Sequence, residues 1–392
     1  MKKISAVALG LSLAGVAQAS SSVSIYGLLD LSVGVSRTGA GTTLPSGSVA
    51  GAPSQSLRRV DSGLGAGSRL GFRGVEDLGA GLKANFVLEM GVGADTGNFN
   101  QGGLGFGRQS FVGLGGSNWS VSLGRQYTPM DLALATSESM GGGYWGNVTN
   151  HAAGIYDNVG ATPGDGTYQL MARADNSVLL TGSTGAWTAK LMLAAGNENP
   201  RGTGRMVNAA LAYASGPLAA TVSAARFRQP AGMITATAAP EWISQWMAGG
   251  SYDFGLLKLY AGAFGQNGPD NEASRSAAAT PGAVGASPFA YGWDRNRYLW
   301  LGARVPLGTG AVLAQYSRAK FSYREGGDGS SDIYGVTYEH PLSKRTLLYA
   351  NYGGVRNNAR ANSFLVAAIP LVGPNGYGAS PRAFSLGMRH TF

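Results

Sequence analysis

The most constraining feature of this sequence is a two-residue alternation of apolar and polar side chains that recurs along almost the whole chain. In the stretch 22–35 (SVSIYGLLDLSVGV), Val23 and Leu31 fall on one face while Ser24 and Ser32 fall on the other. The stretch is longer than the ~5 to 6 residues of a common soluble strand. It reaches the ~9 to 11 residues with which a tilted strand crosses a bilayer. The pattern therefore predicts a membrane-spanning strand.

The same alternation predicts sixteen strands in all, an even number of the kind found in bacterial outer-membrane barrels. The further segments lie at about 67–76, 81–94, 106–116, 119–126, 173–182, 186–196, 205–215, 217–228, 243–253, 256–265, 296–305, 310–321, 332–340, 345–355 and 382–392.

The connectors between these segments alternate between long and short. The long ones are 36–66, 95–105, 127–172, 229–242, 266–295 and 356–381, and tight turns such as 77–80, 116–118 and 183–185 separate them. Outer-membrane barrels have long outer loops and short periplasmic turns. A secreted β-sandwich, propeller or β-helix also has many strands, but a sandwich does not require this alternation and no blade-length repeat is found. We therefore expect an all-β, 16-stranded antiparallel transmembrane barrel.

The composition agrees with this architecture. Glycine accounts for 63 of 392 residues and only 13% of residues are charged, against ~25% charged residues in soluble domains. The chain has no cysteine, which excludes disulfide, thiol and zinc-thiolate sites. The three histidines, His151, His340 and His390, lie far apart in sequence. We expect neither a metal nor a cofactor.

The N-terminus predicts export. Two lysines, an apolar stretch and the small-x-small site Ala17–Ala19 indicate a secretory signal peptide at 1–19, and its apolar stretch is too short for a transmembrane helix. The mature chain, 20–392, is then a single barrel domain. Loss of the two lysines lowers the formal net charge from +9 to +7. The remaining basic residues are scattered, so we expect no nucleic-acid partner.

Six stretches in this order resemble the Gram-negative general-diffusion porins of the β-proteobacterial type. They are SSVSIYGLLDLSVGV (21–35), GSRLGFRGVEDLGAGLKANFVLE (67–89), GRQSFVGLGG (107–116), VSLGRQYTPMD (121–131), RADNSV (173–178) and FSLGMRHTF (384–392). The resemblance implies a homotrimer in the cell outer membrane of a Gram-negative bacterium, in contact with lipid and lipopolysaccharide. It also implies insertion by the barrel-assembly machinery, a third external loop folded into the channel, and small hydrophilic solutes as cargo.

The connector 127–172 is the candidate for that constriction loop, because a loop of this length in a compact structure is commonly functional. It carries the sequence GGGY and four carboxylates, at positions 131, 138, 157 and 165. Glu138 and the glycines after it resemble the acidic loop tip of the family, although the family's common Pro-Glu-Phe-Gly-Gly wording is absent. We expect Asp131 and Glu138 to form the acidic side of the constriction.

Strand alternation indicates which basic side chains face this loop. In 67–76 the apolar Leu70 and Phe72 share one face, which sends Arg69 and Arg73 inward. The same argument sends Lys83 and Glu89 inward, because a charge on the lipid face near the midplane costs ~2 to 4 kcal/mol.

Further along the chain, we expect Phe111 to face lipid, which would send Arg108 and Ser110 inward. The resemblance places Arg69 and Arg108 at the family's pore-arginine positions. Arg173, after the loop, is a third candidate. Arg73 and Arg125 are further candidates that could instead pair with nearby carboxylates or with a neighbouring subunit.

Arginines on a wall that face carboxylates on a loop would produce a transverse field across a narrow aqueous passage. We therefore expect passive diffusion of small hydrophilic solutes and ions, with a mild preference for anions. The alternative is a channel specific for oligosaccharide, phosphate or organic anions. Its sequence signal is the aromatic group Trp293, Tyr298 and Trp300, for which aromatic girdle and loop packing is the favoured interpretation.

Two other classes of function, an enzyme and an adhesive or immune-exposed protein, also occur on membrane barrels. The histidines have no recognisable nucleophile or carboxylate partner motif, so we do not expect an enzyme. An adhesive or immune-exposed role for the long loops is compatible with transport.

The end of the chain predicts how the barrel closes. Phe384, Leu386, Met388, His390 and Phe392 share the parity that faces lipid. This strand must pair with the first one, because an open sheet edge in hydrocarbon is prohibitively costly. The resemblance implies that the terminal phenylalanine is also part of the signal recognised by the assembly machinery.

Overall fold

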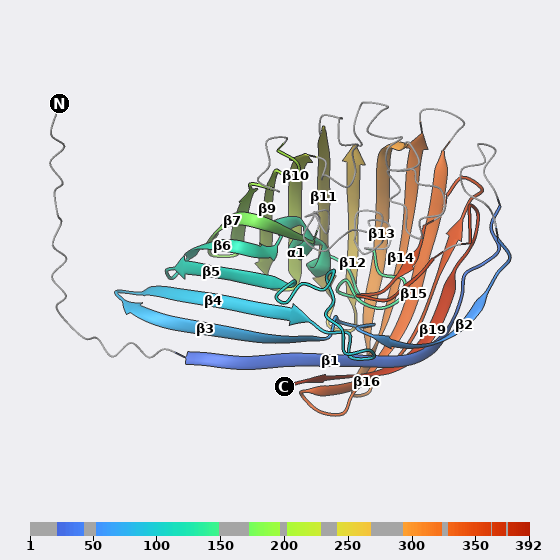
Figure 1. Ribbon diagram of the computed structural model, residues 1–392, viewed down its shortest axis with the longest axis horizontal. Coiled ribbons are helices and arrows are strands. Elements are labelled where there is room, and N and C mark those ends of the chain that lie inside the picture. The colour runs from blue at the N-terminus through green and yellow to red at the C-terminus, as the bar shows by residue number, and fades with distance from the viewer. Residues whose placement is uncertain are drawn as a thin grey trace.

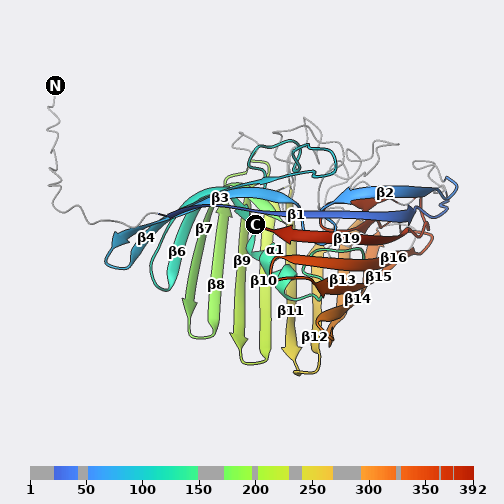
Figure 2. The same ribbon diagram turned by 90° about the horizontal axis from the view of Figure 1, so that it is seen from below.

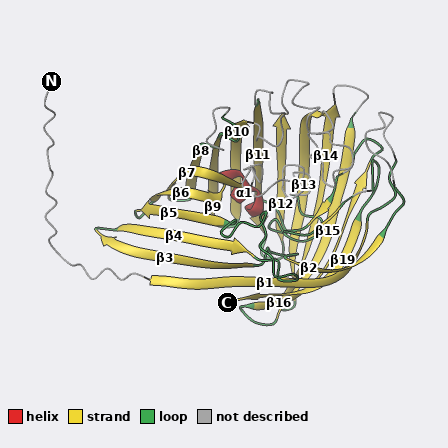
Figure 3. Ribbon diagram, viewed as in Figure 1, coloured by secondary structure: helices red, strands yellow, loops and turns green. Residues whose placement is uncertain are grey.

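The protein is described by a computed structural model that covers residues 22–42, 52–148, 172–196, 202–228, 241–267, 293–323, 328–361, 363–373 and 375–392. The signal peptide expected at 1–19 lies outside these described residues, as do His151, Asp157 and Asp165. Within them the strands form a barrel that surrounds one short helix (Figures 1 and 3).

The sheet of the barrel contains 17 strands. Two of them, β2 (Ser56–Ser62) and β3 (Arg69–Gly79), lie one after the other along the same edge of β1 (Ser22–Arg37), so together they count as one of 16 strands around the wall. These two strands pair with the outer and the periplasmic part of β1, respectively. The remaining strands are β4 (Leu82–Gly91), β5 (Gln109–Gly115), β6 (Trp119–Tyr127), β7 (Arg173–Thr184), β8 (Trp187–Ala194), β9 (Met206–Ser215), β10 (Leu218–Arg228), β11 (Trp242–Asp253), β12 (Lys258–Asn267), β13 (Trp293–Leu307), β14 (Gly310–Tyr323), β15 (Gly329–Pro341), β16 (Thr346–Asn357) and β19 (Arg382–Thr391).

The last strand closes the barrel. β19 pairs antiparallel with β1 from Leu28↔Thr391 to Arg37↔Arg382 and with β16 on its other side. The predicted 16-stranded antiparallel barrel is confirmed. Short hairpin turns join β7 to β8, β9 to β10 and β11 to β12 at one end of the barrel (Figure 2).

β2 lies within 36–66, which the alternation predicts to be a connector, so that prediction is wrong. Along β2, Arg58 and Val60 pair with Val35 and Val33 of β1, so the outward face of this strand carries a charge beside an apolar residue. The apolar alternation that marks the other strands is therefore absent, although the backbone still completes the wall.

The long connectors contain further elements that the alternation did not reveal. The helix α1 (Pro129–Thr136) begins after Thr128, whose hydroxyl accepts a hydrogen bond of 3.2 Å from the backbone N–H of Asp131. This is a standard N-cap, followed by proline at the first helical position. A small hairpin, β17 (Leu365–Val366) and β18 (Leu371–Val372), lies between β16 and β19. Among the described helices, none is long and apolar enough to cross a membrane.

The prediction of which β5 side chains face lipid and which face the lumen was wrong. Val112 is 59% exposed on the outer surface, and Leu114 shares its face. Ser110 therefore faces outward and Phe111 inward, because pairing places Phe111 beside the inward-facing Val87 of β4. An apolar side chain faces inward here because the interior at this height holds the helix α1 and is not uniformly aqueous.

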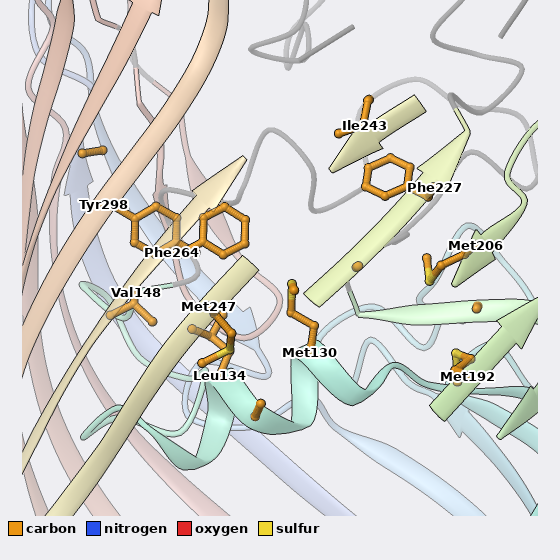
Figure 4. Close-up of a cluster of buried hydrophobic side chains, with 14 of the residues drawn as sticks. Met130, Leu134, Val148, Met192, Met206, Phe227, Ile243, Met247, Phe264 and Tyr298 are labelled. Carbon is orange, nitrogen blue, oxygen red and sulfur yellow. The ribbon is translucent and has the colours of Figure 1, made fainter. Parts of the chain in front are cut away.

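The interior contains an apolar core in which α1 packs against β8–β11 and side chains of β12 and β13 complete the cluster. Met130 and Leu134 of α1 are fully buried beside Met247 and Phe264, from β11 and β12 (Figure 4). The connector after β6 is therefore folded into the barrel, as predicted. We call residues 128–172 loop 3, which is described as far as Val148 and again at Ala172.

Candidate functional site

Loop 3 is fixed to the opposite wall of the barrel by two buried tryptophans. The indole N–H of Trp145 donates to Ser385 Oγ of β19 at 3.0 Å, and its backbone N–H donates to Asn351 Oδ1 of β16 at 2.8 Å. The indole N–H of Trp300, on β13, donates to the carbonyl of Ser137 at 2.8 Å. These contacts place loop 3 across the lumen rather than above it.

Tyr144 makes a further contact with the wall near the periplasmic end. Its hydroxyl donates to Glu339 Oε1 at 2.7 Å, and the same carboxylate is paired with Arg304 at 2.9 Å and Arg389 at 3.5 Å. Burial raises the pKa of Tyr144, and the neighbouring Glu339 charge adds to this effect. Tyr144 therefore remains a neutral hydrogen-bond donor at physiological pH.

Glu138 lies inside loop 3 rather than on its surface. Its side chain is 2% exposed, and its carboxylate accepts hydrogen bonds from the backbone N–H groups of Met140 and Gly142. Burial raises the pKa of Glu138 to about 7, against the opposing effect of these backbone donors. The geometry assigns Glu138 to the shape of the loop.

A cluster of arginines occupies the wall formed by β3–β7. Arg108 Nε donates to Glu89 Oε1 at 2.7 Å, and Arg69 Nε lies 3.9 Å from Glu89 Oε2. The hydroxyl of Tyr26 donates to the same carboxylate at 2.9 Å. Glu89 thus holds Arg69 of β3 and Arg108, which directly precedes β5, at one height in the barrel.

Tyr127 joins the third arginine to this group. Its hydroxyl accepts hydrogen bonds from Arg108 at 2.6 Å and Arg173 at 2.5 Å, and the Arg173 guanidinium lies 4.3 Å from the centre of the ring. Asp131, in the first turn of α1, interacts electrostatically with Arg108. We call Arg69, Arg108 and Arg173, with Glu89, Tyr127 and Asp131, the arginine cluster.

The other basic candidates lie outside the arginine cluster. Arg73 is exposed and stacks 5.1 Å from the centre of the Tyr26 ring. Lys83 is exposed one residue into β4, near the tight turn. Arg125 donates to the carbonyl of Gly107 and pairs with Asp175 at 2.5 Å.

Comparison with known proteins places this architecture in a family. The sequence profile of a family described as Gram-negative porin matches residues 5–360. The chain belongs to the Gram-negative porin family. An outer membrane porin protein of Bordetella pertussis is 30% identical over 91% of this chain and 94% of its own length. Outer membrane porin protein 32 of Delftia acidovorans is 30% identical over 100% of both chains.

A solved structure agrees with this assignment. An anion-selective porin from Comamonas acidovorans aligns with a TM-score of 0.71 and 26% sequence identity, covering 95% of this chain and 100% of that one. The protein is therefore a porin of the Gram-negative outer membrane. Family and fold together indicate a channel for passive diffusion rather than an enzyme.

The aromatic residues suggested for a sugar-specific channel are packed under loop 3 of the porin. Tyr298 is 1% exposed and Trp300 is 4% exposed, and the Trp293 side chain lies outside the described residues. Tyr298 and Trp300 thus contribute to loop packing.

The histidines contact neighbouring hydroxyl groups. His340 Nδ1 lies 3.2 Å from the Tyr338 hydroxyl, and His390 Nδ1 lies 2.8 Å from Thr346 Oγ1. Within the described ranges, no three His, Cys, Asp or Glu side chains are grouped so as to hold a metal ion.

The porin chain ends in the seam of the barrel. The backbone of Phe392 exchanges two hydrogen bonds with Gly27 of β1, at 3.0 and 3.1 Å. The ring of Phe392 covers Gly27, where a Cβ atom would lie only 2.2 Å from the ring. Phe384, Leu386 and Met388 are each more than 40% exposed on the outer face of β19.

Two central members of the arginine cluster, Glu89 and Tyr127, were missing from the predicted site. The alternation in β4 sends the Glu89 side chain inward, so the sequence could have identified Glu89 as a site residue. Tyr127 had no such signal, because a bulge between Gly124 and Gln126 interrupts the alternation just before it.

Proposed function

We propose that the arginine cluster and loop 3 form the constriction of this porin and give its aqueous channel a mild preference for anions. The observation that carries the proposal is the convergence of Arg69, Arg108 and Arg173 on Glu89 and Tyr127. With Asp131, three arginines face two carboxylates, which leaves a formal charge of +1. Charge lining a low-dielectric passage concentrates counter-ions.

The members of the cluster have different parts in this proposal. Arg69 is 28% exposed at its side chain and is positioned to contact passing solutes directly. Arg108 and Arg173 are each 6% exposed and contribute mainly through their field. Arg73 and Lys83 add positive charge to the inner wall away from the cluster. The anion selectivity of the structural relative from Comamonas acidovorans supports the same direction.

Three further properties follow from membership of the family and are also proposals. We propose that the mature protein, 20–392, assembles as a homotrimer embedded in outer-membrane lipid and lipopolysaccharide. The apolar side chains on the outer face of β1 and β19 fit a lipid or subunit surface. The terminal segment, with Phe384, Leu386, Met388 and Phe392, would be recognised by the barrel-assembly machinery before it closes the seam.

Reconstitution tests the channel. Purified protein in a planar bilayer should give stepwise conductance that rises linearly with KCl concentration. Liposomes that contain it should swell in neutral sugars at rates that fall with sugar size and do not saturate. Protein-free liposomes and heat-denatured protein are the controls. Absence of conductance, or swelling that saturates with one sugar alone, would contradict passive diffusion.

A further inference from the structure

A cavity of about 200 Å³ lies on the inner face of the barrel wall beside the arginine cluster. Its apolar lining includes Phe111 of β5, Leu179 of β7 and Leu132 of α1, so the cavity lies between the helix and the wall. Its other side is polar and includes Lys190 of β8. Tyr127 lines the cavity as well, which joins it to the arginine cluster.

Lys190 gives the cavity a single positive charge. Its ammonium donates to Thr181 Oγ1 at 3.3 Å, and no carboxylate lines the cavity. In the part of the chain that the structure describes, no ion pair involves Lys190. An ammonium has three donors, so at least two remain available. A partly buried cation without a counter-charge favours an anionic ligand.

The size and the lining of the cavity restrict the class of anion. An apolar cavity of ~150 Å³ is large enough to hold benzene, and this cavity is somewhat larger and carries a cation at one side. Inorganic anions would leave the Phe111, Leu132 and Leu179 side chains in contact with water. A ring or short hydrocarbon attached to a carboxylate would cover them.

We propose that this cavity, the Lys190 pocket, binds small organic carboxylates with an apolar body, of which an aromatic monocarboxylate is the simplest. The carboxylate pairs with Lys190, and the apolar body contacts Phe111 and Leu132. The inference rests on the proposed channel, because the ligand reaches the pocket through the lumen.

Benzoate is the probe that tests this pocket. It should reduce the current through single trimers in planar bilayers at lower concentration than acetate, which lacks the ring, or benzyl alcohol, which lacks the charge. Lys190→Met should weaken benzoate binding at least tenfold, because a charge-assisted hydrogen bond contributes ~1.5 to 3 kcal/mol. Leu132→Ser should weaken the effect of benzoate and leave that of acetate unchanged.

The matched control is Lys258→Met. Lys258 is a lysine of β12 that stacks on Tyr260 and lies outside the cavity, so this variant should respond to benzoate as the wild type does. Equal benzoate affinity in the wild type and Lys190→Met, or equal effects of acetate and benzoate, would overturn the proposal that this pocket binds aromatic carboxylates. Chloride conductance in the same bilayers tests the proposed channel separately, and its absence would overturn that proposal.

Discussion

Replacing Glu138 by glutamine should abolish a pH dependence in the stability of loop 3. Burial raises the pKa of Glu138 from 4.5 to about 7, so folded loop 3 binds this proton more tightly than the unfolded chain does. The resulting stability is fully present below pH 4.5 and is lost as the pH rises through 7. Glutamine keeps the shape of the side chain and does not titrate.

The interval between these two pKa values sets the size of the effect. From 4.5 to about 7, at ~1.36 kcal/mol per pKa unit, loop 3 loses roughly 3 kcal/mol. Glutamine has one acceptor oxygen where glutamate has two, so it gives up the hydrogen bond from Met140 or Gly142 at a cost of ~1 kcal/mol. The variant should therefore be less stable by ~1 kcal/mol at pH 4.5 and more stable by ~2 kcal/mol at pH 8.

Hydrogen exchange measures this directly at the amides of Met140 and Gly142. After correction for intrinsic exchange rates, wild-type protection should fall roughly 50-fold between pH 5 and 8. Protection in Glu138→Gln should stay level, and Glu76→Gln, which alters an exposed carboxylate of β3, should follow the wild type. Wild-type protection that does not change with pH, or a Glu138→Gln variant with the same decline, would refute the reasoning.

Three other predictions concern the seam and the attachment of loop 3. Gly27→Ala forces the tip of the half-exposed Phe392 ring away from the seam and should destabilise the folded barrel by ~1 kcal/mol. The temperature at which the folded species disappears on a heat-modifiability gel should fall, whereas Gly182→Ala, with open space around its Cβ position, should leave it unchanged. Deletion of Phe392 should reduce the yield of assembled protein, and an unchanged yield would argue against its role in closure. Trp300→Phe removes the indole hydrogen bond to loop 3, at a cost of ~1 to 3 kcal/mol, and should increase single-channel current noise. Noise equal to that of the wild type would show that this bond does not hold the loop.

The strands could be predicted from the sequence because lipid imposes a strict pattern on one face. The segment expected at 217–228 is β10, Leu218–Arg228, and the last strand begins at Arg382 as expected. The pattern fails in β2, which carries Arg58 on the same outward face as Val60. Alternation therefore identifies only those strands whose outward face is uniformly apolar.

The interior could be predicted only in part. Alternation correctly sent Arg69 and Glu89 inward, but it misplaced Phe111, because α1 makes this part of the lumen apolar. The contact of Trp145 with Ser385 joins residues 240 positions apart, and no local pattern encodes such a pair. Burial of Glu138 depends on the same long-range packing and could not be read from its neighbours.

The reversal potential in a KCl gradient tests the central claim, that the arginine cluster sets the selectivity of the channel. The wild type should favour chloride. Arg69→Gln combined with Arg108→Gln should move the reversal potential toward cation preference. Glutamine is preferable to glutamate at position 108, where a second carboxylate would face Glu89. Arg73→Gln combined with Arg125→Gln removes the same two charges outside the cluster and should have a smaller effect. A wild type that favours potassium, or an equal shift from this control pair, would contradict the account.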